Sequence, residues 1–206
     1  MLKKILDGIS AGILISIGGS VFLACYADNK YIGAIMFSVA LLFICLKGYS
    51  LFTGKIGYLV DNHTKNDIAV TFLGLLGNAI ATCLLGMAIR YALPNLGKVA
   101  SVICNAKLTQ EFLQTLVRSI FCGILMYLAV SVYREGKGIA GIFFAVPVFI
   151  LSGFEHSIAN MFYFGASGIF SLKAFGYIWL VILGNSIGGM LLPAIDLLGR
   201  KGKANE

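Results

Sequence analysis

The sequence "LSGFEHSIANMF", residues 151–162, places a glutamate and a histidine side by side in the most apolar part of the chain. Between Lys137 and Lys173, Glu155 and His156 are the only residues with a charged or imidazole side chain. The surrounding apolar stretch, residues 138–165, exceeds the ~20 residues that one helix needs to cross a bilayer. We therefore predict that the helix in this stretch is broken within residues 152–162.

A second apolar stretch, residues 31–61, is also too long for one straight helix and contains "KGYSLFTGK" at residues 47–55. Glycine-interrupted segments at corresponding places in two halves of a chain indicate inverted repeats. Irregular backbone at membrane depth is tolerated only where it is buried in protein or lines a cavity. We therefore expect the two breaks to meet near the middle of the membrane, the alternative being two kinks without a function.

The composition identifies an integral membrane protein. Of 206 residues, 59% are hydrophobic and 12% are charged, whereas soluble domains carry about 25% charged residues. The first apolar window contains Asp7 and lacks a small-residue cleavage site, so we interpret it as a span and not as a signal peptide. We predict one all-α transmembrane domain over residues 1–206, with six spans in two inverted three-helix repeats at about 1–96 and 97–200. The apolar windows are 5–26, 31–61, 67–94, 107–133, 138–165 and 173–199.

The net charge of +7 is better explained by membrane topology than by nucleic-acid binding. Basic residues concentrate in the short cytoplasmic loops of membrane proteins. An even number of spans with both termini in the cytoplasm gives that asymmetry. The inner ends would then hold Lys3, Lys4, Lys65, Arg134, Lys137, Arg200, Lys201 and Lys203, and the outer ends Lys30, Arg90, Lys98 and Lys173.

Other classes of protein lack support in the sequence. The five cysteines are widely spaced without a CxxC pair, so we expect buried small side chains and no disulfide framework, metal site or cofactor. An enzyme is disfavoured because only two histidines exist, His63 lies in a loop, and no Ser/His/Asp set is present. A structural subunit would not need a polar centre at paired breaks. A neutral-solute channel of the aquaporin kind would carry paired "NPA" boxes, which are absent.

Four polar residues are candidates for the pore. His156 lies inside a span, where an ionisable residue indicates function, and an imidazole titrates near neutral pH; the alternative is a satisfied structural histidine. Thr53 could form a hydrogen bond with His156. Lys107 and Asn185 could line a vestibule, or act as an interfacial anchor and a helix–helix hydrogen bond. Glu155 we interpret as a loop anchor that accepts backbone N–H groups freed by the break.

The strings "GFEHSIANMF", "GNSIGG" and "LFTG" together resemble the formate/nitrite transporter family, and the resemblance extends over nearly the whole chain. It implies an aquaporin-like fold of six spans, assembled as a homopentamer in a bacterial or archaeal cytoplasmic membrane. By position, His156, Thr53, Lys107 and Asn185 match the family's pore residues, and Asn160 belongs with Glu155 as a loop anchor. The resemblance also implies two apolar rings: Phe37, Leu41 and Phe149 on the cytoplasmic side, and Leu51, Phe52 and Met126 on the other.

The chain departs from the family pattern at several positions. Ser50 stands where an acid is common, Lys47 adds a positive charge, and Gly123 replaces a polar residue. We expect these changes to widen or re-charge the pore. The amino-terminal extension of relatives is missing, so the resemblance leaves open whether a mobile cytoplasmic helix gates the pore.

The expected function is passage of small monovalent anions of weak acids, namely formate, nitrite or hydrosulfide, with proton coupling through His156. An anion between apolar rings becomes a stronger base, because low dielectric disfavours its charge. It could then take a proton from water or from His156 and cross as a neutral acid. The alternative is a channel for small neutral solutes or for larger monocarboxylates such as lactate.

Overall fold

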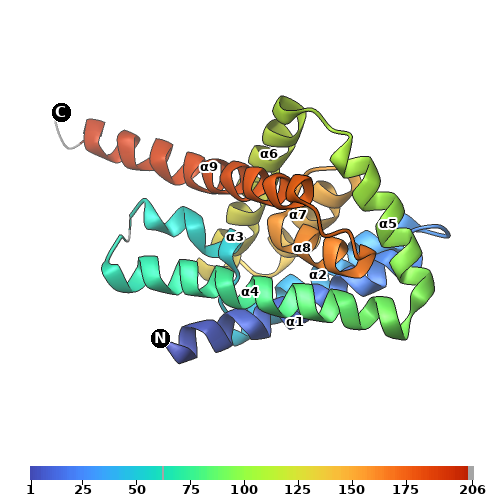
Figure 1. Cartoon of the computed structure of the whole chain (residues 1–206). Coiled ribbons are helices and arrows are strands. Elements are labelled where there is room, and N and C mark those ends of the chain that lie inside the picture. Colours follow the sequence, from blue (N-terminus) through green and yellow to red (C-terminus); the bar gives the residue numbers. More distant parts are fainter. Residues whose placement is uncertain (62, 204–206) are drawn as a thin grey trace.

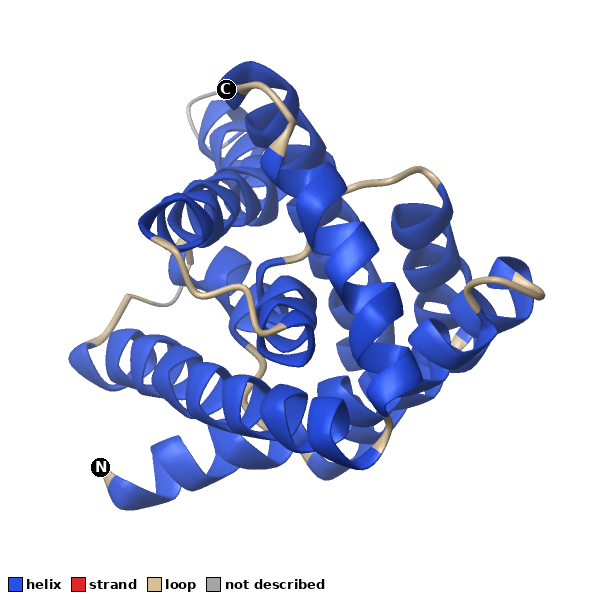
Figure 2. Cartoon of the chain, turned by 45° about the vertical axis from the view of Figure 1, so that its right-hand side comes forward, coloured by secondary structure: helices blue, strands red, loops and turns tan. Residues whose placement is uncertain are grey.

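The computed structural model describes residues 1–61 and 63–203, and over these residues the chain is helical without any strand (Figures 1 and 2). Short segments join the helices, and two of these segments lie at the two predicted breaks. The helices are α1 (Leu2–Cys25), α2 (Lys30–Lys47), α3 (Phe52–Lys55), the 3₁₀ helix η1 (Ile56–Leu59), α4 (Lys65–Ala92), α5 (Pro94–Leu108), α6 (Phe112–Arg134), α7 (Ala140–Leu151), α8 (Ser157–Ser167) and α9 (Leu172–Lys203).

The helices are those of a multi-pass membrane protein. Among the described residues, five helices are long and apolar enough to cross a bilayer, namely α1, α2, α4, α6 and α9, whereas α7 has only 12 residues. Both predicted breaks are present: α2 ends four residues before α3 begins, and α7 ends five residues before α8 begins. The N-terminus and the C-terminal end of α9 lie on the same side of the molecule, at the left of Figure 1.

Both breaks begin with the same local structure. Gly48 and Gly153 each have a φ of 69°, the left-handed conformation that an L side chain disfavours. Tyr49 N–H donates to the Ile44 carbonyl at 3.0 Å, and Phe154 N–H donates to the Phe149 carbonyl at 2.9 Å. This pattern is the Schellman motif, which satisfies the last carbonyls of a helix while turning the chain away from the helix axis.

The two breaks lie inside a layer of long helices. α1 packs along α4, α6 packs along α9, and α8 lies among them with every residue buried (Figure 1). The long helices approach closely because glycines face their neighbours. A Cβ at Gly77 would lie 2.3 Å from the Ile5 carbonyl oxygen of α1, and one at Gly123 would lie 2.3 Å from the Asn185 carbonyl oxygen of α9. Small residues at such contacts are typical of helix packing in membranes.

The boundary between the two predicted repeats, at about residue 96, lies in a helix of its own, α5. This helix begins with Pro94 at its first turn, a position that suits proline because no N–H donor is needed there. Lys107 lies in the last turn of α5, so our expectation that Lys107 opens the fourth span is wrong. The fourth span starts later, at α6, where Glu111 and Gln114 form a capping box.

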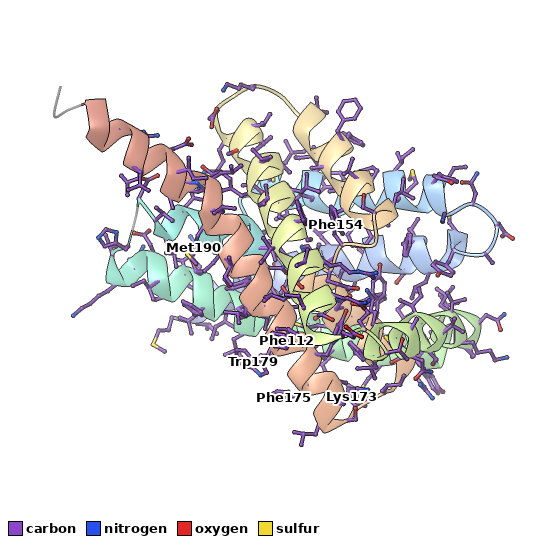
Figure 3. All side chains as sticks on the ribbon, turned by 90° about the horizontal axis from the view of Figure 1, so that it is seen from above. Phe112, Phe154, Lys173, Phe175, Trp179 and Met190 are labelled. Atoms are coloured by element: carbon purple, nitrogen blue, oxygen red, sulfur yellow. The ribbon has the colours of Figure 1, made fainter. Side chains whose placement is uncertain are left out.

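Large apolar side chains cover much of the outer surface. Phe112 is 66% exposed, Phe175 is 61% exposed and Trp179 is 53% exposed. Figure 3 shows these three residues on the outside of α6 and α9, with Lys173 nearby. Soluble monomers rarely present contiguous apolar patches of this kind, so this surface faces lipid or another protein chain.

Candidate functional site

The two breaks are joined by one polar contact between side chains. Thr53 lies in α3, directly after the first break, and His156 is the N-cap of α8, directly after the second. The Thr53 hydroxyl lies 2.9 Å from His156 Nε2, and both residues are buried. Residues far apart in the chain thus place a hydroxyl and an imidazole at the point where the breaks meet.

The second ring nitrogen of His156 is also occupied. Its Nδ1 accepts a hydrogen bond from the Ala159 N–H at 3.1 Å. In a neutral imidazole one ring nitrogen accepts and the other carries the proton, so this contact assigns the proton to Nε2. His156 Nε2 therefore donates to the Thr53 hydroxyl oxygen, which leaves the Thr53 O–H free to donate to a third group. The Phe149 ring stacks on the imidazole at 5.5 Å between centroids.

Asn185 of α9 holds the second break by hydrogen bonds to backbone. Its Oδ1 accepts from the Ser157 N–H at 2.8 Å, and its Nδ2 donates to the Glu155 carbonyl at 2.8 Å. The same Nδ2 donates to the Ser119 carbonyl of α6 at 2.8 Å. Asn185 is fully buried, and these three bonds use its acceptor and both of its donor hydrogens.

Asn78 of α4 holds the first break in the same way. Its Oδ1 accepts from the Phe52 N–H at 3.0 Å, and its Nδ2 donates to the Ser50 carbonyl at 2.9 Å and to the Gly8 carbonyl of α1 at 2.7 Å. Each break therefore receives one carboxamide from the last long helix of its own half. Each carboxamide also reaches the first long helix of that half.

Glu155 anchors the second break through side chains and not through backbone N–H groups, contrary to our expectation. Its Oε2 accepts from Lys107 Nζ at 2.5 Å and from Asn160 Nδ2 at 2.9 Å. Its Oε1 accepts from Gln110 Nε2 at 2.9 Å. The freed N–H groups find other acceptors, because Asn185 takes that of Ser157 and the Arg118 carbonyl takes that of Glu155. The Glu155 side chain is 2% exposed and that of Lys107 is 15% exposed.

A cavity of about 210 Å³ opens beside His156. We call it the Lys107 cavity. Its acidic, basic and imidazole side chains are those of Lys107, its partner Glu155, His156 and Arg118. Glu155 compensates the charge of Lys107. Arg118, the other cation of this wall, has no carboxylate of the described residues within 4 Å. Aromatic rings complete the wall: Phe22, Tyr26, Phe149, Phe154 and Tyr163.

A second cavity, of about 270 Å³, is lined by the C-terminal turns of α2 and α6. We call it the Arg134 cavity. Its walls include the cations Lys55 and Arg134 together with the Cys45 side chain. The two cavities share no lining residue. His156 lies in the wall of the first cavity, and Thr53 directly precedes Gly54 in the wall of the second.

Buried apolar side chains separate the cavities, but not in the two rings that we expected. Phe149 lines the Lys107 cavity, whereas Leu41 and Leu51 both line the Arg134 cavity. The Phe37 ring contacts Phe149 edge-on at 6.4 Å between centroids. Phe37, Phe52 and Met126 line neither cavity and are at most 2% exposed.

The structure gives local roles to the departures from the family pattern. The Ser50 hydroxyl donates to the Val70 carbonyl at 3.1 Å and so joins the first break to α4. Gly123 lies against the backbone of α9, where it permits close helix packing and does not widen a cavity. Lys47 is exposed and lines neither cavity.

Sequence reasoning missed four residues of this site: Asn78, Gln110, Arg118 and Lys55. A signal for Asn78 was present, because "LGNAI" at residues 76–80 resembles "LGNSI" at residues 183–187. Nothing in the sequence pointed to the other three, because their place in the site depends on which helix faces meet.

A family model that matches nearly the whole chain identifies the family. A family model described as "Formate/nitrite transporter" matches residues 1–197. The chain belongs to the formate/nitrite transporter family. The chain is 28% identical over 184 residues to the protein named formate channel FocA of Escherichia coli, an alignment that covers 78% of this chain and 65% of that protein. The chain thus spans about two thirds of the length of this relative.

Solved structures show the same fold. A structure titled "FNT family ion channel" has a TM-score of 0.86 at 20% identity, covering 97% of this chain and 90% of the other. A structure titled "Pentameric formate channel with formate bound" has a TM-score of 0.73 at 25% identity, covering 96% of both chains. Membership in the formate/nitrite transporter family places the chain among transporters and not among enzymes. Among the described residues, no group of three His, Cys, Asp or Glu side chains is placed to hold a metal ion.

Proposed function

We propose that this protein is a membrane channel for small monovalent anions of weak acids, namely formate, nitrite or hydrosulfide. One observation carries the proposal: two cavities approach a single buried polar contact, Thr53–His156, that is otherwise surrounded by an apolar seal. Formate and nitrite are also the anions in the description of the family. The seal comprises Phe37, Leu41, Leu51, Phe52, Met126 and Phe149.

The seal determines the form in which the anion crosses. Moving a bare monovalent ion from water into a low-dielectric medium costs on the order of 20 kcal/mol by an idealised calculation. A neutral acid avoids most of this cost, and low dielectric also favours its formation because it disfavours the charged form. Formate, nitrite and hydrosulfide have accessible neutral acids, whereas chloride does not. We therefore propose that each anion crosses together with one proton.

The passing acid meets His156 and Thr53 in the centre of the seal. The Thr53 hydroxyl already accepts a hydrogen bond from His156 Nε2, so its own proton can be donated to an oxygen or sulfur atom of the acid. To supply a proton itself, His156 would first need protons on both nitrogens. A proton on Nδ1 would face the Ala159 N–H, which now donates to Nδ1 at 3.1 Å. This contact favours water in the cavities as the source of the proton.

We propose the finer architecture on the same grounds. The equivalent roles of Asn78 and Asn185 support two inverted repeats, with α2–α3–η1 and α7–α8 as the broken spans among six. The position of both chain ends on one side supports both termini in the cytoplasm. The exposed apolar surface of α6 and α9 supports assembly with further copies, and a homopentamer with one pore per protomer agrees with the pentameric structure of similar fold.

A reconstituted flux assay on His156→Asn tests the role of the histidine. Asparagine keeps a hydrogen-bond donor near the Thr53 hydroxyl but cannot titrate. If water supplies the proton, formate should still enter with one proton each, at a reduced rate. If His156 supplies the proton, the variant should lose proton movement and pass formate as a current.

The alternative is a channel for small neutral solutes or for larger monocarboxylates such as lactate. Uptake of glycerol, lactate and formate by the same liposomes separates these possibilities. Rapid glycerol uptake that does not depend on pH would contradict the anion proposal.

A further inference from the structure

The Arg134 cavity has an unusual charge for the wall of an apolar channel. Lys55, in the last turn of α3, is half-buried, and Arg134, in the last turn of α6, is exposed at the mouth. Both side chains line the cavity, and no carboxylate of residues 1–61 or 63–203 does. Neither side chain forms an ion pair with any residue that the structure describes. Lys55 is the half-buried member of the pair, and a cation buried within a membrane protein is costly, so such a residue indicates a functional site.

Asp7 lies near enough to Lys55 to attract its charge, but no carboxylate of the described residues forms an ion pair with Lys55 or Arg134. The Arg134 guanidinium lies 4.0 Å above the centre of the Tyr58 ring, a contact that orients the side chain without removing its charge. An adjoining cavity of about 120 Å³, also lined by Lys55 and Arg134, includes Asp67. The Asp67 carboxylate accepts a hydrogen bond from the Thr64 hydroxyl, and the Asp67 backbone N–H donates to the Thr64 hydroxyl oxygen. It forms no ion pair with Lys55 or Arg134.

The two cavities differ in their net charge. In the Lys107 cavity, Glu155 compensates Lys107 and leaves Arg118 as the unpaired cation. The Arg134 cavity has two cations and no lining carboxylate. Clefts lined by charges of one sign concentrate counter-ions by about 10-fold or more. The stronger attraction for anions is therefore expected on the Arg134 side of the seal.

We propose that Lys55 and Arg134 form a binding site for a small monovalent anion in the Arg134 cavity, on the opposite side of the seal from Lys107. The anion occupies this cavity next to Leu41 and Leu51. It is protonated there before it enters the seal. Its role in transport rests on the proposed function, whereas the binding site itself does not.

Cys45 provides a reporter inside the cavity. Its thiol lines the wall beside Arg134 and forms a disulfide with methanethiosulfonate reagents, releasing methanesulfinate. Purified protein in detergent is treated with an anionic sulfonatoethyl or a cationic trimethylammonioethyl reagent, and peptide mass spectrometry measures the modification of each cysteine. We expect the anionic-to-cationic rate ratio at Cys45 to exceed that at Cys25, which lines neither cavity, by about tenfold.

Substitutions identify the cations responsible. Lys55→Met combined with Arg134→Gln should lower the ratio at Cys45 about tenfold and leave the ratio at Cys25 unchanged. Lys47→Met is the matched control, because it removes an exposed cation of the same helix as Cys45 from outside the cavity. Formate should slow the anionic reagent in the wild type and not in the double variant.

Three outcomes would overturn the inference. The ratio at Cys45 could match that at Cys25, it could fall equally in the Lys47→Met control, or neither reagent could reach Cys45. The first two would mean that Lys55 and Arg134 only complement the ends of their helices. The third would mean that the cavity is closed to anions.

Formate uptake by liposomes then tests the role in transport. At low ionic strength the double variant should raise the KM for formate several-fold with little change in the saturated rate. Added salt should reduce the difference, because a Debye length is about 8 Å at physiological ionic strength. A wild type without any formate flux would contradict the proposed function, while the reagent ratio at Cys45 would still report the site.

Discussion

At the scale of single residues, Asn78 and Asn185 have the clearest structural role. Each carboxamide makes three hydrogen bonds to backbone groups of a break and of a neighbouring long helix. A buried backbone group that loses its partner costs about 1–3 kcal/mol. These asparagines therefore allow the breaks to be buried next to the apolar seal.

Asn185→Ala should lower the free energy of unfolding several times more than an ordinary surface substitution does. The change leaves the Ser157 N–H and the Glu155 carbonyl without partners, and we expect a loss of about 2–4 kcal/mol from these groups together. Asn66→Ala, at an exposed asparagine bound by Lys4, is the control. Thermal unfolding in detergent measures both, and equal midpoints for the two variants would contradict this role.

The Lys107–Glu155 pair gives a second prediction. Lys107→Met leaves a buried carboxylate uncompensated, and breaking a fully buried pair lowers the free energy of unfolding by about 3–5 kcal/mol. Because the Lys107 side chain is partly exposed, we expect a smaller loss of stability here. Adding Glu155→Gln should recover part of the loss, because the remaining carboxamide is neutral. Lys137→Met, which breaks the exposed pair with Glu135, should leave the unfolding midpoint unchanged. A double variant less stable than Lys107→Met alone would contradict the pairing.

At the scale of helices, the two breaks could be predicted and their surroundings could not. Excess length and the glycines at 48 and 153 predicted where the helices end, because both signals are local in sequence. The Lys107–Glu155 contact joins residues 48 positions apart, so only the packing of α5 against α8 brings them together. We grouped the apolar rings wrongly, because Phe149 and Leu41 line different cavities. Which cavity each residue lines depends on how α7 packs against α2, and the sequence does not give that packing.

Gly153→Ala tests the left-handed turn at the second break. A Cβ at Gly153 meets nothing within 4 Å, so the cost is conformational and should be about 1–2 kcal/mol. Gly176→Ala in α9 is the matched control, since its Cβ also meets nothing and alanine favours a helix by up to about 1 kcal/mol. We expect a lower unfolding midpoint for the first variant and an equal or higher one for the second. A midpoint for Gly153→Ala at or above the wild type would contradict the strained turn.

At the scale of the whole molecule, the charge distribution and the apolar surface agree with one account. In this proposed account, anions gather in two cavities, the seal admits only the neutral acid, and the outer faces of α6 and α9 contact lipid or further copies of the chain. The fold and the family are each supported by a match over nearly the whole chain. The choice between anions depends on the width of the seal.

Native mass spectrometry in detergent tests the assembly. We expect five copies of the chain, because the exposed apolar surface allows contact with further copies and a pentameric channel shares the fold. Substituting lysine for Phe175 and Trp179, both on the surface of α9, tests whether this face belongs to the subunit contact or to lipid. A stable monomer or dimer of the wild type would contradict the pentamer.

The most direct measurement is formate flux into liposomes with simultaneous recording of internal pH and membrane current. If the seal passes only the neutral acid, each formate that enters should bring one proton, the interior should acidify, and no current should flow. Chloride under the same gradient should not enter. Formate entry that carries current without acidifying the interior would show that the bare anion crosses, and would contradict the account.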